Sequence, residues 1–205
     1  MSTPFSSTHR FWKPKIVLSV LALILCAGLA AATVFTMYYA NFTATVKAPD
    51  VRLVAGNDNI GGTVYPTASI TVASTYDYAT VGFSMFPSAT NSPQPATYYT
   101  NPLNITNVGS SSHTIQAITV TSVTDASSSL GNITIYYFAT QTDTPETATP
   151  LGVASITDTT VPVSIFTGTQ TIAAGATQYI EIVAYAAEDA SVDATVTFTV
   201  SIQWV

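Results

Sequence analysis

Histidine and cysteine, the side chains that most often supply nucleophilic or metal chemistry, are almost absent from this 205-residue chain. The one cysteine, Cys26, lies in an apolar run near the N-terminus, so neither a disulfide framework nor a thiolate metal site can be built. A Ser/His/Asp triad would have to use His113, which directly follows serines at 110–112. We interpret His113 as a residue of a solvated loop or of a strand start.

Acidic residues suggest two further kinds of chemistry. A pair of carboxylates such as Glu181 and Glu188 could hydrolyse a glycosidic bond, but these residues fit a strand face and the turn after it. The stretches 57–59 and 188–193 contain the oxygen ligands that calcium prefers, although Asn and Asp also bond to their own backbone in turns. The sequence therefore predicts no enzyme, no cofactor and no metal site, with calcium between acidic subunits as the open alternative.

The charged residues are few and unevenly distributed. They make up 8% of the chain, against 47% hydrophobic residues, and the net charge is -6. No Lys or Arg follows Arg52, whereas every acidic residue except Asp50 does. A body without basic residues cannot neutralise nucleic-acid phosphates, which excludes nucleic acid as a partner. The threonine-rich, hydrophobic composition is typical of β-structure and not of disorder.

Residues 1–32 have the layout of an export signal. Arg10, Lys13 and Lys15 precede an apolar run at 16–29, and alanines at 30–32 supply the small residues that signal peptidase requires. We expect cleavage after Ala32. Because apolar residues continue to position 39, a retained membrane anchor is the alternative.

In both cases we expect the rest of the chain outside the cell, secreted or on the cell surface, with membrane contact only during export if the signal is cleaved. Three sequons agree with this location, at Asn41, Asn104 and Asn132. Each would be an acceptor for an N-glycan at a surface position.

Beyond residue 33 the hydrophobic pattern has a period of two, and no helical period is sustained. It is clearest at 194–204, where apolar residues at even positions alternate with hydroxyl residues. Less regular strands are predicted at 63–73, 79–86, 113–123, 132–140, 161–166 and 177–187, and an ordered surface loop at 87–102, which contains four prolines. Many short strands without an intervening helix predict an all-β domain at 50–205, a β-sandwich with jelly-roll or Greek-key connectivity.

Residues 33–49 have a separate pattern. From Ala40 to Lys47, apolar even positions alternate with polar odd positions. A free apolar strand at a mature N-terminus promotes aggregation unless it is paired. Either this segment is the first strand of its own sandwich, or it is donated to the sheet of the next subunit, with 48–50 as the link. The donor strand would contain the residues Thr33, Val34, Phe35, Met37, Tyr38, Ala40, Phe42, Ala44 and Val46.

This layout resembles that of the TasA-like fibre proteins, which include bacterial biofilm-matrix TasA, camelysin relatives, and archaeal bundling pili and surface threads. The similar features are the signal ending in alanines, the Thr/Val segment after it, the helix-poor sandwich, and the closing pattern of 172–177 and 196–202. The lack of Lys and Arg and the many Tyr and Thr residues are most similar to the archaeal members. The resemblance implies secreted subunits that donate residues 33–46 to the next subunit and bundle laterally in biofilms.

We therefore expect a structural filament subunit whose partners are copies of itself. Repeated head to tail, strand donation does not close and produces a filament. The alternative is a membrane-anchored surface module that binds carbohydrate through Tyr98, Tyr99, Tyr136 and Tyr137. These tyrosines also fit core or cross-strand pairs, because aromatic residues favour strands for packing reasons.

Overall fold

The structure is a computed structural model that describes residues 19, 22, 47–58, 68–86, 96–126, 128–188, 190 and 195–205. The chain divides into two units, Met1–Val46 and Lys47–Val205. The cleavage site after Ala32, the donor strand and the sequon at Asn41 belong to the first unit and lie outside the described residues. Within the described ranges, no helix is long and apolar enough to cross a membrane.

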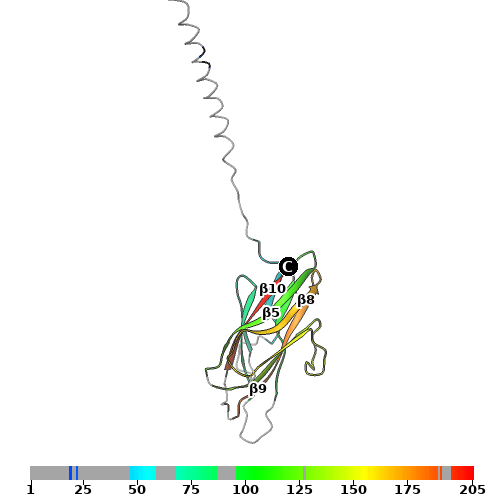
Figure 1. Cartoon of the computed structure of the whole chain (residues 1–205). Helices are drawn as coiled ribbons and strands as arrows, with labels where there is room; N and C mark the ends of the chain where they lie inside the picture. The colour runs from blue at the N-terminus through cyan, green and yellow to red at the C-terminus, as the bar shows by residue number, and fades with distance from the viewer. Residues whose placement is uncertain are drawn as a thin grey trace, which may run out of the picture. The chain divides into compact units, whose positions relative to one another are not determined.

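The second unit is a β-sandwich of two antiparallel five-stranded sheets, and no helix interrupts its described residues (Figure 1). Sheet A has the order β1 (Val51–Ala55), β4 (Thr97–Asn107), β9 (Thr177–Ala186), β6 (Leu130–Phe138) and β7 (Gly152–Ile156). Sheet B has the order β2 (Ala68–Val72), β3 (Tyr78–Ser84), β10 (Thr195–Trp204), β5 (His113–Thr124) and β8 (Val163–Ile172). These sheets confirm the predicted fold class.

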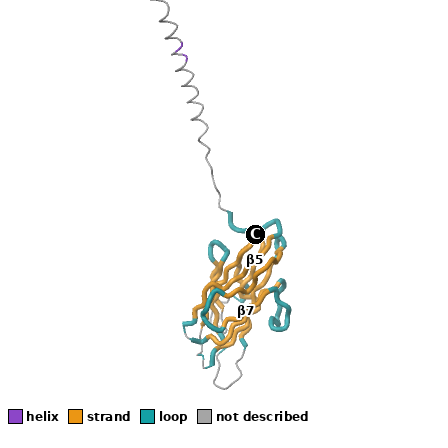
Figure 2. The backbone as a smooth tube through the Cα atoms, in the orientation of Figure 1, coloured by secondary structure: helices purple, strands orange, loops and turns teal. Residues whose placement is uncertain are grey.

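The connections between these strands are of the jelly-roll kind. Only β2–β3 and β6–β7 are sequential neighbours within a sheet, and every other connection crosses to the opposite sheet. Figure 2 shows the resulting body, with strands side by side and loops between them. The central strands β9 and β10 come last in the chain, so each sheet pairs segments that are far apart in sequence.

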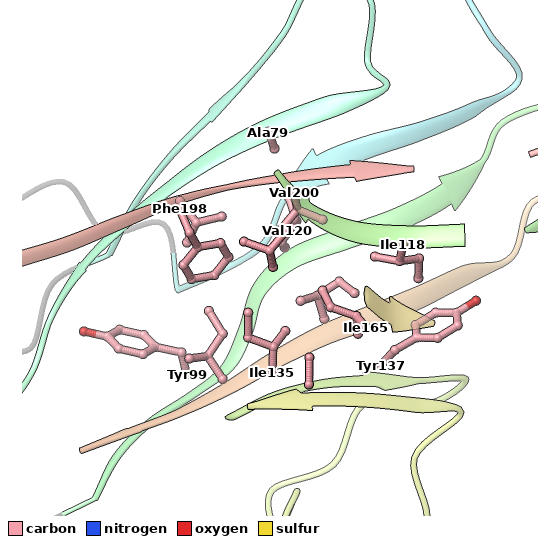
Figure 3. Packing of buried hydrophobic residues seen from close by; sticks show 14 of the residues in the cluster. Ala79, Tyr99, Ile118, Val120, Ile135, Tyr137, Ile165, Phe198 and Val200 are labelled. Carbon is pink, nitrogen blue, oxygen red and sulfur yellow. The ribbon is translucent and has the colours of Figure 1, made fainter. Parts of the chain in front are cut away.

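The core lies between the sheets and follows the period-two pattern. In β10 the even residues Val196, Phe198, Val200 and Ile202 are buried, while the hydroxyl residues between them are at least partly exposed. Side chains from sheet A, including Ile135, meet them from the opposite side (Figure 3). Phe198 packs edge-on against the ring of Phe83, with centroids 5.7 Å apart. Burial of such alternate positions is the main stabilising term of a sandwich.

Three strands were not predicted, and one prediction is wrong. The strands β1, β4 and β7 have no counterpart among the expected segments, and residues 97–102 of the expected proline-rich loop belong to β4. β4 accommodates Pro102 at an irregularity, because its register with β9 shifts between Tyr99 and Leu103. A proline cannot donate to a ladder, so a bulge is where a central strand can contain one.

Replacing Phe198 with Ala should lower the free energy of unfolding by about 3–5 kcal/mol, because a fully buried ring leaves a cavity in a close-packed core. Thr195→Ala, on the exposed face of the same strand, is the control and should change it by less than about 0.5 kcal/mol. Urea denaturation measures both. Equal effects of the two substitutions would contradict the assigned register of β10.

Candidate functional site

The first residues of the second unit, Lys47–Asp50, are held at the end of the sandwich where the chain's C-terminus lies. The Asp50 carbonyl accepts a hydrogen bond from Val108 N at 2.8 Å, and the Asp50 carboxylate lies 3.6 Å from Lys47 Nζ and 3.4 Å from His113 Nε2. Next to His113, the backbone of Thr114 pairs with that of Val205. The first described residues of the body and its C-terminus therefore lie at the same end of the sandwich (Figure 1). The segment 33–46 is covalently joined to this end.

His113 is the first residue of β5, as one of the two interpretations expected. Its ring packs edge-on against Trp204, with centroids 4.7 Å apart, and its side chain is 17% exposed. These contacts give the histidine a structural role in joining the link to the last strand.

A buried asparagine fixes the turns at this end. Asn107 is fully buried, and its Nδ2 donates to the carbonyls of Ser111 at 2.8 Å, Ala173 at 3.0 Å and Ile172 at 3.1 Å. Its Oδ1 accepts from Gly109 N at 2.9 Å. The side chain thus joins the β4–β5 turn to the β8–β9 turn, where Gly175 has a φ of 71°. No sequence signal singled out Asn107, because its partners lie in two separate turns.

The outer face of sheet B carries no Asp, Glu, Lys or Arg in any of its five strands. Its outward residues are mainly hydroxyl residues: Ser69, Thr71, Thr80, Ser122, Thr197, Thr199 and Ser201. Thr199 Oγ1 lies 2.9 Å from Ser122 Oγ and 3.4 Å from Thr80 Oγ1. We call these residues the hydroxyl face. It can meet another surface without desolvating a charge.

The border strands of the two sheets differ in the contacts that they make beyond their paired neighbours. In β1, Leu53 N donates to Tyr76 O in the β2–β3 turn at 2.9 Å. In β7, the backbone at Gly152 is in close contact with Ile165 O of β8. Strand β8 itself pairs with β5 through two register shifts. Strand β2 pairs with β3 in unbroken register, as β1 does with β4 and β7 with β6.

The outer face of sheet A carries a group of tyrosines beneath the β6–β7 loop, residues 139–151. Tyr98 donates to Glu146 Oε2 at 2.8 Å and Tyr185 to Glu146 Oε1 at 3.1 Å. The bond to Glu146 raises the pKa of Tyr98 to about 12. Tyr136 stacks on Phe138, with ring centroids 5.9 Å apart. Two elements of the sheet and the loop are thus held together by one carboxylate.

Of the four tyrosines considered as a carbohydrate platform, only two lie on this outer face. Tyr98 is 46% exposed and Tyr136 is partly exposed, whereas Tyr99 and Tyr137 point into the core (Figure 3). Tyr99 donates to Ser84 O at 2.6 Å and Tyr137 to Gln178 Oε1. Neighbouring residues in a strand face opposite sides of the sheet, so the adjacent pairs cannot act as one platform.

The two described sequons also lie on the outer face of sheet A, within strands. Asn104 is on β4 between Val54 and Tyr179, and Asn132 is on β6, where its Oδ1 accepts from Ser155 Oγ at 2.7 Å. Both asparagines are partly exposed. Glycosylation at these positions stays a prediction.

The oxygen-rich segment at 57–59 makes backbone bonds where it is described. Asp58 Oδ2 accepts from Asn101 N at 2.7 Å, and Asp58 N donates to Asn101 O at 3.0 Å. Throughout the part of the chain that the structure describes, no three His, Cys, Asp or Glu side chains are grouped so as to hold a metal ion.

The sequence matches no known protein-family model, and it matches no curated protein. A function for this chain is therefore inferred from the arrangement of its own residues.

Asn107→Ala should lower the free energy of unfolding by roughly 2–4 kcal/mol, because it leaves several buried backbone groups without a partner. Asn104→Ala is a matched control in a neighbouring part of the same strand. Its Oδ1 has no hydrogen-bond partner, so a change below about 1 kcal/mol is expected. Thermal or urea unfolding distinguishes the two, and a loss at Asn107 no larger than that at Asn104 would refute the bracing role.

Proposed function

We propose that this protein is a structural subunit of a secreted extracellular filament, and that it polymerises by inserting its N-terminal strand, residues 33–46, into the next subunit. The alternating segment Ala40–Lys47 carries this proposal. All ten strands of the described sandwich begin at Val51 or later, and their inward residues form the core cluster. A strand-like apolar segment needs a sheet to pair with, and a second copy supplies one.

One further feature of the body agrees with head-to-tail assembly. The segment is covalently joined to the body through Lys47–Asp50, and Asp50 is fastened at one end of the sandwich, so the donor segment and the rest of the subunit are distinct surfaces. A contact of this heterologous kind repeats without closing, which makes a fibre.

The hydroxyl face suits contacts between neighbouring filaments. A chain with net charge -6 repels its copies. Because the strands of sheet B carry no charged residue, electrostatic repulsion between two copies is smallest where these faces meet. Hydroxyl groups can exchange hydrogen bonds with water for hydrogen bonds across such a contact.

The second candidate is a membrane-anchored surface module that binds carbohydrate. The observation that favours it is the pair Tyr98 and Tyr136 on the outer face of sheet A, close to the carboxylate of Glu146. Aromatic faces next to a carboxylate are suited to stacking on sugar rings while binding their hydroxyls.

Electron microscopy of residues 33–205, beside a version that begins at Asp50, tests the proposal. Filaments are expected from the longer protein only, because the shorter one lacks the donated strand. Discrete monomers from both would reject strand donation and favour the anchored module.

A point substitution gives a sharper test within the longer protein. Phe42→Asp should abolish filaments, because a charge at an inward position of the donor strand cannot enter an apolar groove without partners. Thr45→Asp, on the opposite face of that strand, is the matched control and should still assemble. Circular dichroism must show the same β-content in both. Equal assembly by the two variants would argue against an inserted strand.

A further inference from the structure

Glu181 is a carboxyl group buried on the outer side of sheet A. The residues on either side of it, Ile180 and Ile182, belong to the core between the sheets, so Glu181 points away from that core. Its side chain is nevertheless 0% exposed, and Val183, also directed outward, is 1% exposed. The β6–β7 loop covers this region, and Thr142 N of the loop donates to Glu181 Oε1 at 2.8 Å.

The second oxygen of Glu181 is buried without a hydrogen-bond partner, and so is Oδ1 of Asn101. These two residues are on neighbouring strands. Tyr99 pairs with Ile182 and Leu103 with Ile180, so the bulge 100–102 lies opposite Glu181. A carboxylate oxygen that is buried without a donor loses its hydration, whereas a neutral carboxyl group has no charge to desolvate. The pocket therefore fits the neutral acid better than the ion.

The charged groups around Glu181 also oppose its ionisation. The acids that face it are Asp58 from the segment after β1 and Asp143 from the loop, with Glu146 further along the loop. The other titratable groups on this side of the sheet are tyrosines: Tyr136 pairs with Glu181, Tyr98 pairs with Val183, and Tyr179 and Tyr185 belong to the same strand as Glu181. Burial raises the pKa of Glu181 to about 7, Asp143 and Asp58 raise it as well, and the bond from Thr142 opposes them.

The basic side chains in the described part of the chain are engaged elsewhere. Lys47 and His113 both contact Asp50, and Arg52 donates to Pro49 O and lies over the ring of Tyr76. None of these contacts brings a positive charge to Glu181, and the sequence contains no Lys or Arg after Arg52.

The loop that covers Glu181 is held at few points. Glu146 binds the hydroxyls of Tyr98 and Tyr185, Thr142 binds Glu181, and Leu151 N donates to Tyr137 O where the loop rejoins β7. A cavity of about 270 Å³ is lined by residues of the 138–151 segment. A loop that packs around such a space can leave the sheet without disrupting the main core.

We propose that Glu181 is a proton-dependent latch: as the neutral acid it holds the β6–β7 loop against sheet A, and as the carboxylate it releases the loop into water. Release uncovers Val183 and Phe138, both buried but outside the core cluster. This latch does not require filament assembly.

The direction of the pH dependence follows from proton linkage. In the open loop Glu181 is hydrated, and its pKa returns toward the ordinary 4.5, below the value of about 7 in the closed loop. The closed form therefore binds the proton more tightly. Its stability is greatest below about pH 4.5, falls as the pH rises to about 7, and levels off above that.

Hydrogen exchange at the Thr142 amide measures the opening. After correction for the intrinsic rate, protection should fall on the order of 70-fold between pH 5 and pH 8, which follows from the two pKa values. The Val200 amide in the centre of sheet B should remain more protected than Thr142 at every pH, because the opening is local. Simultaneous exchange of the two amides would mean global unfolding and would overturn the latch.

Two glutamate variants separate the latch from other titrating groups. In Glu181→Gln, protection at Thr142 should stay within 3-fold over the same pH range, since the amide does not ionise. In Glu146→Gln, at the loop's other attachment, the full pH step should remain. A step that survives in Glu181→Gln assigns the titration to another residue and refutes the proposal.

The carbon-13 shift of the Glu181 carboxyl group provides a test in the unaltered protein. A titration midpoint near 7 is expected, and a midpoint near 4.5 with the loop closed would reject the latch. Calcium chloride is added at pH 8 in a second measurement, and no gain in Thr142 protection is expected. Restored protection would show that a divalent cation can close the loop over the Glu181 carboxylate, and it would refute the proposal that protonation is what holds the loop.

Discussion

Burial of alternate side chains between two sheets is the constraint on which the rest of this structure depends. The central strands β9 and β10 carry the inward residues Ile180, Ile182, Phe198 and Val200, and every other strand is positioned by pairing outward from them. Both central strands come last in the chain. The sheets can therefore close only after most of the body is present, and the outward positions of each strand are left free for another use.

The outer faces of the two sheets carry different kinds of residue. Sheet B presents hydroxyl groups and no charged strand residue, whereas sheet A carries Glu181, the tyrosines bound to Glu146, and a loop that covers part of its surface. The basic residue Arg52 and the pair Lys47 and Asp50 stay at the start of the body. Under the proposed function, this asymmetry assigns the uncharged face to contacts between copies and leaves the other face to respond to its surroundings.

The strands that the sequence predicted best are those with one apolar and one hydroxyl face. β10 begins one residue after its predicted start, and β5 and β9 begin at their predicted residues. These strands are predictable because burial of one face produces a period of two in the sequence. β4 escaped prediction because the prolines at 93 and 95, before it, and Pro102, within it, indicate a loop, and a bulge that depends on the partner strand accommodates Pro102. β1 and β7 are too short to show a period.

The sequence by itself determined the all-β class, the period of two, and the confinement of basic residues to the first quarter of the chain, since each of these is a property of residue type and spacing alone. Tertiary structure decided what covers each outward face. In sequence, Glu181 occupies an ordinary outward position of an alternating strand, and nothing near it indicates that Thr142 of the β6–β7 loop covers it. Periodicity specifies the side of a sheet on which a residue lies, whereas its burial depends on distant segments that fold over that side.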